Sequence, residues 1–205
     1  ADLAAGKRSM VQIQAHHLDK DRLQGRIAVI RALLAFFQGD VPDIVHHARR
    51  ALECLPDFDS AWRSSAAIAL GDAYRIEGDI KAAYRARRDA LEISRAAGNI
   101  YMILVGSMKL AVTMRQQGQL AEAREMCEQQ LALAHESGLS HTGVAGGFLA
   151  ILAEVQAESG DLAGSLERAR RGVALAERGE FSAADVVKAR DSLGIDPDKA
   201  DPTTV

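Results

Sequence analysis

The amino-acid sequence predicts an all-α protein, an α-solenoid of about four helical hairpins followed by one short C-terminal helix. Glycine-centred turns recur at nearly equal intervals of 39, 40 and 42 residues, at Gly39, Gly78, Gly118 and Gly160. Between these turns apolar residues return at i, i+3, i+4 and i+7, the pattern of a helix with one buried face. Aromatic residues make up only 4% of the chain. The core therefore has to be built from Ala, Leu, Val and Ile, which suits closely packed helices.

Each interval divides into two helices of roughly 16 to 20 residues, because a second series of turns lies between the first. These turns are centred on Gly98, Gly138 and Gly179, and on Pro56 in the first hairpin. Glycine tolerates the left-handed conformation that commonly ends a helix. Aspartates follow three turns of the first series and can cap the next helix through a side-chain oxygen; they are Asp40, Asp79 and Asp161.

The second helix of each hairpin has one apolar stripe and one charged face. Ala83 and Ala123 lie on the apolar stripes, and their small side chains predict close helix crossings. Cys54 and Cys127 also lie on apolar faces, which predicts inert core thiols. We interpret the charged face as solvated and assign it no site; it comprises Arg85, Arg87, Arg88, Glu122, Arg124, Glu125, Glu167, Arg168 and Arg170.

Three parts are expected along the chain. Residues 1–21 form an N-terminal segment that we expect to be partly ordered, and residues 22–193 form the repeat domain. The last helix of this domain is expected between Ser182 and Leu193. Residues 194–205 contain Pro197 and Pro202 and are expected to form a flexible tail.

Composition and charge exclude several classes of function. The formal net charge is −3, which predicts no basic surface for nucleic acid. The sequence has no run of about 18 apolar residues that would span a membrane. Two widely separated cysteines do not make a disulfide framework, so we expect reduced thiols and a cytoplasmic location. No phosphate loop and no arrangement of nucleophile, base and orienting group is evident, so neither enzymatic activity nor a cofactor is predicted.

Residues 70–83, LGDAYRIEGDIKAA, resemble the tetratricopeptide motif closely. Leu70, Gly71, Tyr74, Gly78 and Ala83 stand at signature positions of that motif, and Ala90 follows in register. The resemblance implies a right-handed superhelix of helical hairpins. The first hairpin departs from the motif, because Arg31 stands where Leu is expected. Its first helix is therefore expected to be a terminal cap, which is usually atypical in repeat proteins.

The period of about 40 residues exceeds the 34 of an ordinary tetratricopeptide repeat. The runs RALLAFFQGD, HARRALECLP and ALEISRAAGN are similar to the sensor region of large LuxR-type, ATP-dependent regulators related to the maltose activator MalT. In that family the region lies between an NTPase part and a helix-turn-helix part, and it binds inducers or regulatory proteins. The resemblance implies a non-catalytic sensor segment of such a transcriptional regulator. The alternative is a free-standing tetratricopeptide adaptor that binds a partner protein or peptide.

First helices line the concave surface of a repeat solenoid, where partners usually bind. The motif register points a mixed set of side chains to this surface: Arg26, Ser65, Ile68, Asp72, Arg75, Met108, Val112, Arg115, Gln116, Glu154 and Glu158. Their charges suit a charged peptide, a protein or a small-molecule inducer. The alternative is that they are ordinary solvated residues. Neither direct nucleic-acid binding nor membrane binding is expected, and homo-oligomerisation is left open.

Adjacent aromatic and histidine residues give two further expectations. Phe36 and Phe37 point in different directions on a helix, so we expect one in the core and the other in the groove or at an end. The pairs His16-His17 and His46-His47 each offer at most one ligand to a given ion, because neighbouring helical residues do not face each other. No metal site is predicted.

Gly143, Gly146 and Gly147 lie inside a predicted helix, where each lowers helix stability by up to about 1 kcal/mol. Tight packing of this helix against its neighbour is the favoured explanation. Close approach of a ligand, or a hinge, is the alternative.

Overall fold

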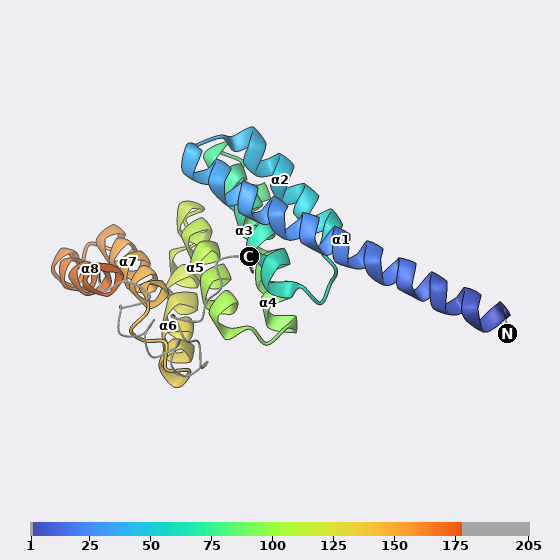
Figure 1. Cartoon of the computed structure of the whole chain (residues 1–205). Coiled ribbons are helices and arrows are strands. Elements are labelled where there is room, and N and C mark those ends of the chain that lie inside the picture. Colours follow the sequence, from blue (N-terminus) through green and yellow to red (C-terminus); the bar gives the residue numbers. More distant parts are fainter. Residues whose placement is uncertain (1, 178–205) are drawn as a thin grey trace, which may run out of the picture. The chain divides into compact units, whose positions relative to one another are not determined.

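The computed structural model describes the backbone of residues 2–177 and, from residue 19 onward, their side chains. Within residues 2–177 the chain forms eight α-helices and no strand, which confirms the all-α solenoid class (Figure 1). The helices are α1 (Asp2–Gln38), α2 (Val41–Cys54), α3 (Ser60–Ile76), α4 (Ile80–Ala96), α5 (Ile100–Gln116), α6 (Leu120–Glu136), α7 (Gly143–Glu158) and α8 (Leu162–Glu177). The helix predicted between Ser182 and Leu193, and the predicted tail, lie outside the described residues.

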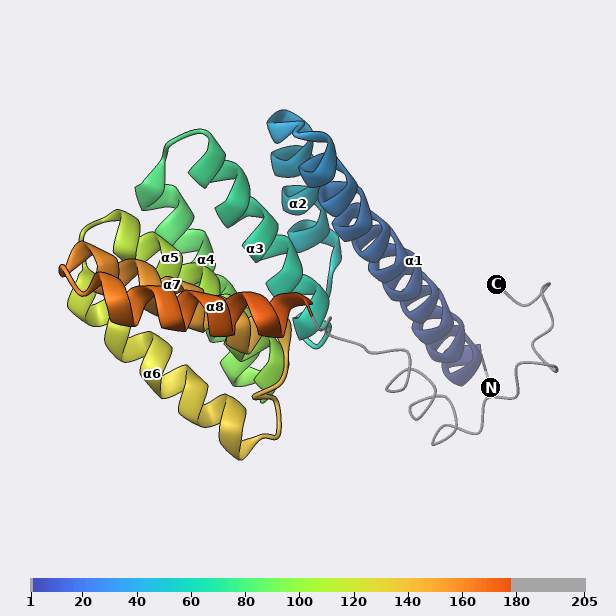
Figure 2. The same ribbon diagram turned by 90° about the vertical axis from the view of Figure 1, so that its left-hand side faces the viewer.

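The chain divides into two compact units, residues 1–130 and residues 131–205, which we call the N-terminal and C-terminal units. In the N-terminal unit each helix from α1 to α5 packs against the next. The first helices of the hairpins also contact one another in succession, α1 against α3 and α3 against α5. Figure 2 shows α1 at one edge of this unit, beside α2. Stacked first helices thus share one side of the unit.

The core of the N-terminal unit consists largely of alanine, as the composition predicts. One cluster joins the first two hairpins and comprises Ala32, Ala35, Ile44, Ala48, Ala69, Leu70, Ala73 and Ala86. Ala83 and Ala123 are completely buried, as expected for residues at close helix crossings. Cys127 is buried, and this burial raises the pKa of its thiol to about 12, so it stays protonated and unreactive.

The turns follow the predicted chemistry. All six turn glycines within the described residues have positive φ, from 64° at Gly98 to 89° at Gly160. After α1 the amide of Gly39 donates to the carbonyl of Phe36 at 3.1 Å, and the amide of Asp40 donates to Ala35 at 2.9 Å. This pair of bonds closes the helix end. The carboxylate of Asp40 then accepts a hydrogen bond from the amide of Asp43 at 3.1 Å and begins α2.

The C-terminal unit is organised by a close crossing of α7 and α8. A Cβ atom at Gly146 would lie 2.7 Å from the carbonyl oxygen of Gly172, and one at Gly172 would lie 2.8 Å from that of Gly146. Both residues are buried. Tight helix packing therefore explains Gly146, which confirms the favoured interpretation of that glycine.

Candidate functional site

A pocket opens between the first helices α1, α3 and α5 of the N-terminal unit, with a volume of about 300 Å³. Ligand pockets begin at about this size. We call it the first-helix pocket, and it is lined by Leu33, Phe36, Phe37, Ser65, Ile68, Ala69, Asp72, Tyr101, Met102, Val105 and Lys109. Most of these side chains are apolar, and the two charged ones lie together.

Helical periodicity brings these residues to one place. On α3 the lining positions Ser65, Ile68 and Asp72 are three and four residues apart, so they share one face of the helix. On α5 the positions Tyr101, Val105 and Lys109 are four residues apart and share a face in the same way. The contacts of α3 with both α1 and α5 turn these faces toward one space.

Aromatic side chains at the end of α1 form one wall of the pocket. Phe36 is half-buried against the alanine core, whereas Phe37 is 82% exposed. Their rings meet edge to face with centroids 5.7 Å apart. The expectation that one phenylalanine packs on the core while the other borders the groove agrees with these positions. An exposed aromatic ring beside a pocket is suited to contact an apolar ligand group.

The floor of the pocket carries a buried carboxylate held between two cations. Asp72 Oδ1 accepts a hydrogen bond from Arg87 Nη2 at 2.6 Å, and its Oδ2 accepts one from Lys109 Nζ at 2.8 Å. Arg87 also donates from Nη1 to the carbonyl oxygen of Lys109 at 2.8 Å and to the hydroxyl of Thr113. These bonds pair the buried charges, which would otherwise be very costly, although Arg87 Nε has no hydrogen-bond partner.

The structure corrects the assignment of Arg87 to the solvated outer face, because only 1% of its side chain is exposed. Gly71 explains how so large a residue fits between α3 and α4. A Cβ atom at Gly71 would lie 2.6 Å from Arg87 Cγ, so the missing side chain provides the space. Burial lowers the pKa of the Arg87 guanidinium, while the Asp72 carboxylate acts in the opposite direction.

One positive charge is in excess at this floor, since Asp72 faces both Arg87 and Lys109. Lys109 is the more accessible of the two cations, with 29% of its side chain exposed. Its Nζ lies 5.9 Å from the centroid of the Phe36 ring. An ammonium group has three donors. After bonding to Asp72, Lys109 keeps donors for an acceptor in the pocket.

Three residues of the predicted binding surface line this pocket, namely Ser65, Ile68 and Asp72. On the same helices, Arg75, Met108, Val112 and Arg115 are half-buried and Gln116 is exposed, without lining the pocket. Glu154 and Glu158 are exposed residues of α7 in the C-terminal unit. Their part in binding stays a prediction.

Arg26 lies in a different environment, beside the loop between α2 and α3. Its guanidinium donates to both oxygens of the Asp59 carboxylate, at 3.2 and 2.9 Å, and Arg22 donates to the same oxygens at 2.8 and 2.9 Å. Hydrogen bonds from Arg22 and Arg26 lower the pKa of Asp59 to about 2, although burial opposes this change. Arg22 also lies 5.4 Å from the centroid of the Phe58 ring. This cluster fastens α1 to the start of α3.

Sequence reasoning missed Leu33, Tyr101, Met102, Val105 and Lys109 as pocket residues. Lys109 had a usable signal, because it is the sole charged residue between positions 100 and 114. A charge at such a position has to be paired or functional. The apolar residues had no such signal, since core and pocket positions share one composition.

Larger depressions lie elsewhere on the N-terminal unit. One of about 510 Å³ is bordered by Asp57, Phe58, Arg63 and Ala97, and one of about 400 Å³ lies among α2, α3 and α4. In both, Arg63 is already engaged, because it donates to the carbonyl oxygens of Leu52 and Leu55 at 3.0 and 2.6 Å. The first-helix pocket is the candidate site because it joins a mainly apolar lining to a charged floor on the side that the first helices share.

Among side chains 19–177 no three His, Cys, Asp or Glu residues come together as metal ligands would. None of the described helices has the length and apolar character needed to cross a bilayer.

Comparison with known proteins identifies the family. The model of the MalT-like tetratricopeptide region matches residues 25–191. The crystal structure of the apo form of RapI is similar, with a TM-score of 0.66 and 14% sequence identity, over 84% of this chain and 68% of that chain. At this identity the likeness shows the fold alone. The comparison with curated proteins gave no match. The match over residues 25–191 covers most of the chain, which therefore belongs to the family of MalT-like tetratricopeptide regions.

Proposed function

We propose that the chain is a non-catalytic binding segment whose ligand enters the first-helix pocket. One observation carries the proposal: an apolar pocket of about 300 Å³ has an accessible ammonium group, Lys109 Nζ, at its floor. Pockets that combine apolar walls with a few convergent polar groups are the usual form of small-ligand sites. The exposed ring of Phe37 would cover the apolar part of the ligand.

The chemistry of the pocket favours a ligand with an apolar group next to a carboxylate. Asp72 is already paired with Arg87 and Lys109, so a ligand cation would find no free acceptor there. A ligand carboxylate would instead meet the excess positive charge and the remaining donors of Lys109. Both an extended peptide and a small organic acid offer this combination.

The family suggests where such a segment acts. We propose that it is the sensor segment of a MalT-like regulator of the LuxR type, located in the cytoplasm and without a cofactor or direct contact with nucleic acid. The second candidate is a free-standing adaptor that binds a partner protein or peptide. The tetratricopeptide hairpins support both candidates equally. An upstream phosphate loop and a downstream helix-turn-helix part in the complete gene would favour the regulator.

The predicted concave residues outside the pocket extend the proposal. Arg75 and Arg115 lie on the same two helices as the pocket floor and are half-buried. We propose that they contact the more distant parts of an extended ligand. Substituting either residue by alanine would then weaken binding less than a change at Lys109.

The experiment uses a matched pair of probes, octanoate and its neutral amide octanamide, added to the 15N-labelled protein. We expect octanoate to shift amide resonances of α1, α3 and α5 at lower concentration than octanamide. The variant Lys109→Gln should abolish this preference, because it removes the cation that faces the carboxylate. Phe37→Ala should weaken the binding of octanoate and octanamide equally.

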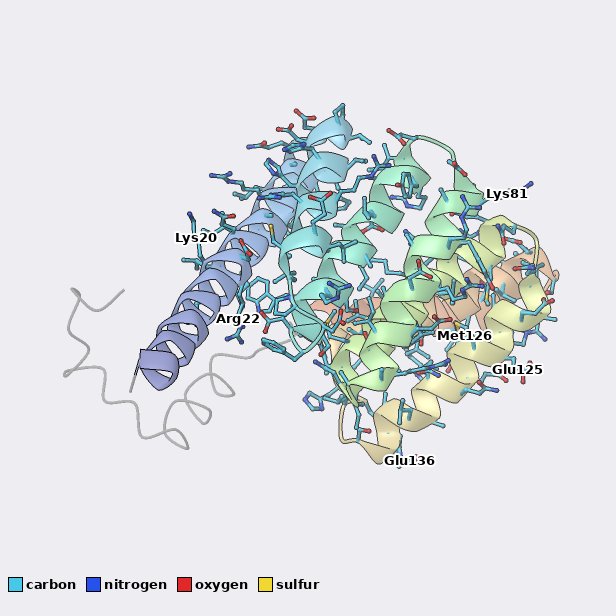
Figure 3. The ribbon with its side chains drawn as sticks, turned by 90° about the vertical axis from the view of Figure 1, so that its right-hand side faces the viewer. Lys20, Arg22, Lys81, Glu125, Met126 and Glu136 are labelled. Atoms are coloured by element: carbon cyan, nitrogen blue, oxygen red, sulfur yellow. The ribbon has the colours of Figure 1, made fainter. Side chains whose placement is uncertain are left out.

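Lys81→Gln is the control, because Lys81 is an exposed lysine at the start of α4 (Figure 3), and no residue of that helix lines the pocket. It should leave both titrations unchanged. Equal shifts for octanoate and octanamide in the wild-type protein would contradict the proposed ligand class. Shifts confined to residues outside α1, α3 and α5 would contradict the proposed site.

A further inference from the structure

The helix α1 is apolar on two opposite faces. Its inner face packs on α2 and α3 through buried residues, which are Gly25, Ala28, Val29, Ala32 and Ala35. Its outer face carries large apolar residues that are between 40% and 82% exposed, namely Leu23, Ile27, Ile30, Leu34 and Phe37. Each residue turns the helix by about 100°, so the two sets lie on opposite sides. We call the outer set the α1 stripe.

The spacing of the α1 stripe is that of a coiled-coil seam. Its members are successively four, three, four and three residues apart, which is a heptad pattern with Ile27 and Leu34 at one core position and Leu23, Ile30 and Phe37 at the other. Terminal repeats of a solenoid are expected to have a polar outer face. The outer face of α1 instead has the composition of a helix–helix interface.

The exposed area is large enough for a specific contact. A fully exposed large apolar residue presents about 200 Å². With the observed exposures the α1 stripe presents about 550 Å², so a pair of such stripes would bury about 1,100 Å² of apolar surface alone. A specific interface needs about 1,000 Å² in total. The flanking residues Gln24, Arg26 and Arg31 would add polar area at the rim.

We propose that this face is an interface between two copies of the chain, in which the α1 helices pair antiparallel. A single stripe that contacts itself across a two-fold axis needs no second surface. In the antiparallel register Leu23 lies opposite Leu34 of the other copy, and Ile27 lies opposite Ile30. Leu23, Ile27, Ile30 and Leu34 then face apolar residues, and Phe37 at the end of the seam faces Lys20.

Charge decides the direction of pairing. In a parallel pair the flanking residue Arg26, whose charge Asp59 partly offsets, would lie beside Arg31 of the other copy. In the antiparallel pair Arg31 lies beside Gln24, which removes this repulsion. The same register places Phe37 against Lys20 of the other copy. Lys20 projects from α1 on the side away from Arg22, which points toward the loop before α3 (Figure 3), and its ammonium group can approach the exposed ring.

The test is the mass of the full 205-residue chain in solution by light scattering. We expect about twice 22.0 kDa for the wild-type protein and 22.0 kDa for Ile30→Glu, whose two carboxylates would meet near the centre of the pair. Helical circular dichroism should be unchanged, because Ile30 is on the outer face. Leu162→Glu is the matched control, since Leu162 on α8 is 70% exposed and lies outside the α1 stripe.

A wild-type mass of 22.0 kDa at tens of micromolar would overturn the proposal, as would a dimer that persists in Ile30→Glu. Dissociation by Leu162→Glu alone would assign the contact to α8 and would also overturn it. Direction is tested in a background without Cys54 and Cys127. Oxidised mixtures of Leu23→Cys and Leu34→Cys should cross-link between the two variants at least tenfold more than within either one; the reverse would show parallel pairing.

Discussion

The hairpins α3–α4 and α7–α8 both place a glycine where two helices cross, but they use it in opposite ways. At α3–α4 the missing side chain of Gly71 leaves space for Arg87, whose Cγ would be 2.6 Å from an added Cβ atom. At α7–α8 the missing side chains of Gly146 and Gly172 let two backbones touch, with each added Cβ atom less than 3 Å from the opposite carbonyl oxygen.

The difference shows that a glycine at a helix crossing can either make room for a buried charged side chain or let two apolar helices approach closely. The α3–α4 crossing holds a charged network that continues to the pocket floor through Asp72 and Lys109. The α7–α8 crossing is bordered by apolar side chains, since added Cβ atoms at Gly146 and Gly172 would lie 3.1 Å from Leu175 Cβ and 3.4 Å from Leu149 Cβ. Hairpins of the same repeat family can therefore have either a charged or an apolar interior. The first three of the four predictions that follow test this contrast and the fourth tests the Asp59 cluster, from the largest expected effect to the smallest.

Removing the carboxylate from the charged crossing should have the largest effect. In Asp72→Ala, Arg87 remains buried without its counter-ion, and breaking a buried pair in this way costs about 3–5 kcal/mol of unfolding free energy. Urea denaturation followed by circular dichroism measures the loss. Asp89→Ala is the control, because Asp89 is exposed on α4, and it should change the free energy by less than about 0.5 kcal/mol. Similar midpoints for the two variants would show that the network contributes little.

Adding a methyl group at the α7–α8 crossing should cause the next largest loss of stability. Gly146→Ala places Cβ against the backbone of Gly172, which cannot move aside without separating α7 from α8, so we expect a loss of about 1–3 kcal/mol. The helix preference of alanine over glycine offsets up to about 1 kcal/mol of the steric cost. Thermal or urea unfolding of the variant measures the net effect.

Gly106→Ala separates sterics from helix propensity in that experiment. Gly106 lies inside α5, and an added Cβ atom there would be 3.5 Å from its nearest neighbour, an ordinary contact. This variant should therefore be as stable as the wild-type protein or more stable by up to about 1 kcal/mol. If Gly146→Ala also gained stability, the α7–α8 crossing would be looser than described.

Gly71→Ala should cost less than Gly146→Ala, because a side chain yields more easily than a backbone. We expect a loss of about 1–2 kcal/mol from displacement of Arg87. The loss should disappear in an Arg87→Ala background, where the space is vacant. A double-mutant cycle measures this coupling, which for contacting residues is about 0.5–3 kcal/mol. Additive effects of the two substitutions would show that Gly71 does not make room for Arg87.

The smallest effect concerns pH and the cluster that fastens α1 to α3. The pKa of Asp59 is lowered from the ordinary value of 3.8 to about 2 in the folded protein. Its ion pairs therefore stabilise the fold fully above pH 3.8, and this stabilisation is lost as the pH falls through about 2. Solvent screening limits the contribution of these ion pairs to the free energy of unfolding to about 1 kcal/mol. The difference in unfolding free energy between wild type and Asp59→Asn should therefore shrink from pH 5 to pH 2. A difference that does not change with pH would exclude this role.

Local signals predicted the repeats well, because a helical period and its turns depend on neighbouring residues. The turn glycines with positive φ and the aspartates after them were identified from spacing alone. The candidate site was predicted in part. Ser65, Ile68 and Asp72 follow from the first-helix register, whereas Tyr101, Val105 and Lys109 become pocket residues only through the packing of α5 against α3.

The sequence by itself determined the helices after α1, their turns and the family, since each depends on periodicity and on residues a few positions apart. It did not predict that α1 begins at Asp2, ahead of the expected repeat domain. Tertiary structure alone decided the environment of the arginines. The same amphipathic pattern assigns Arg87 and Arg88 to one charged face, yet Arg87 is buried against Asp72 and Arg88 is exposed. The cause lies on another helix, where Gly71 leaves the space that Arg87 fills. A pattern within one helix cannot report a gap in its neighbour, and for that reason the charged floor of the pocket emerged only from the packed structure.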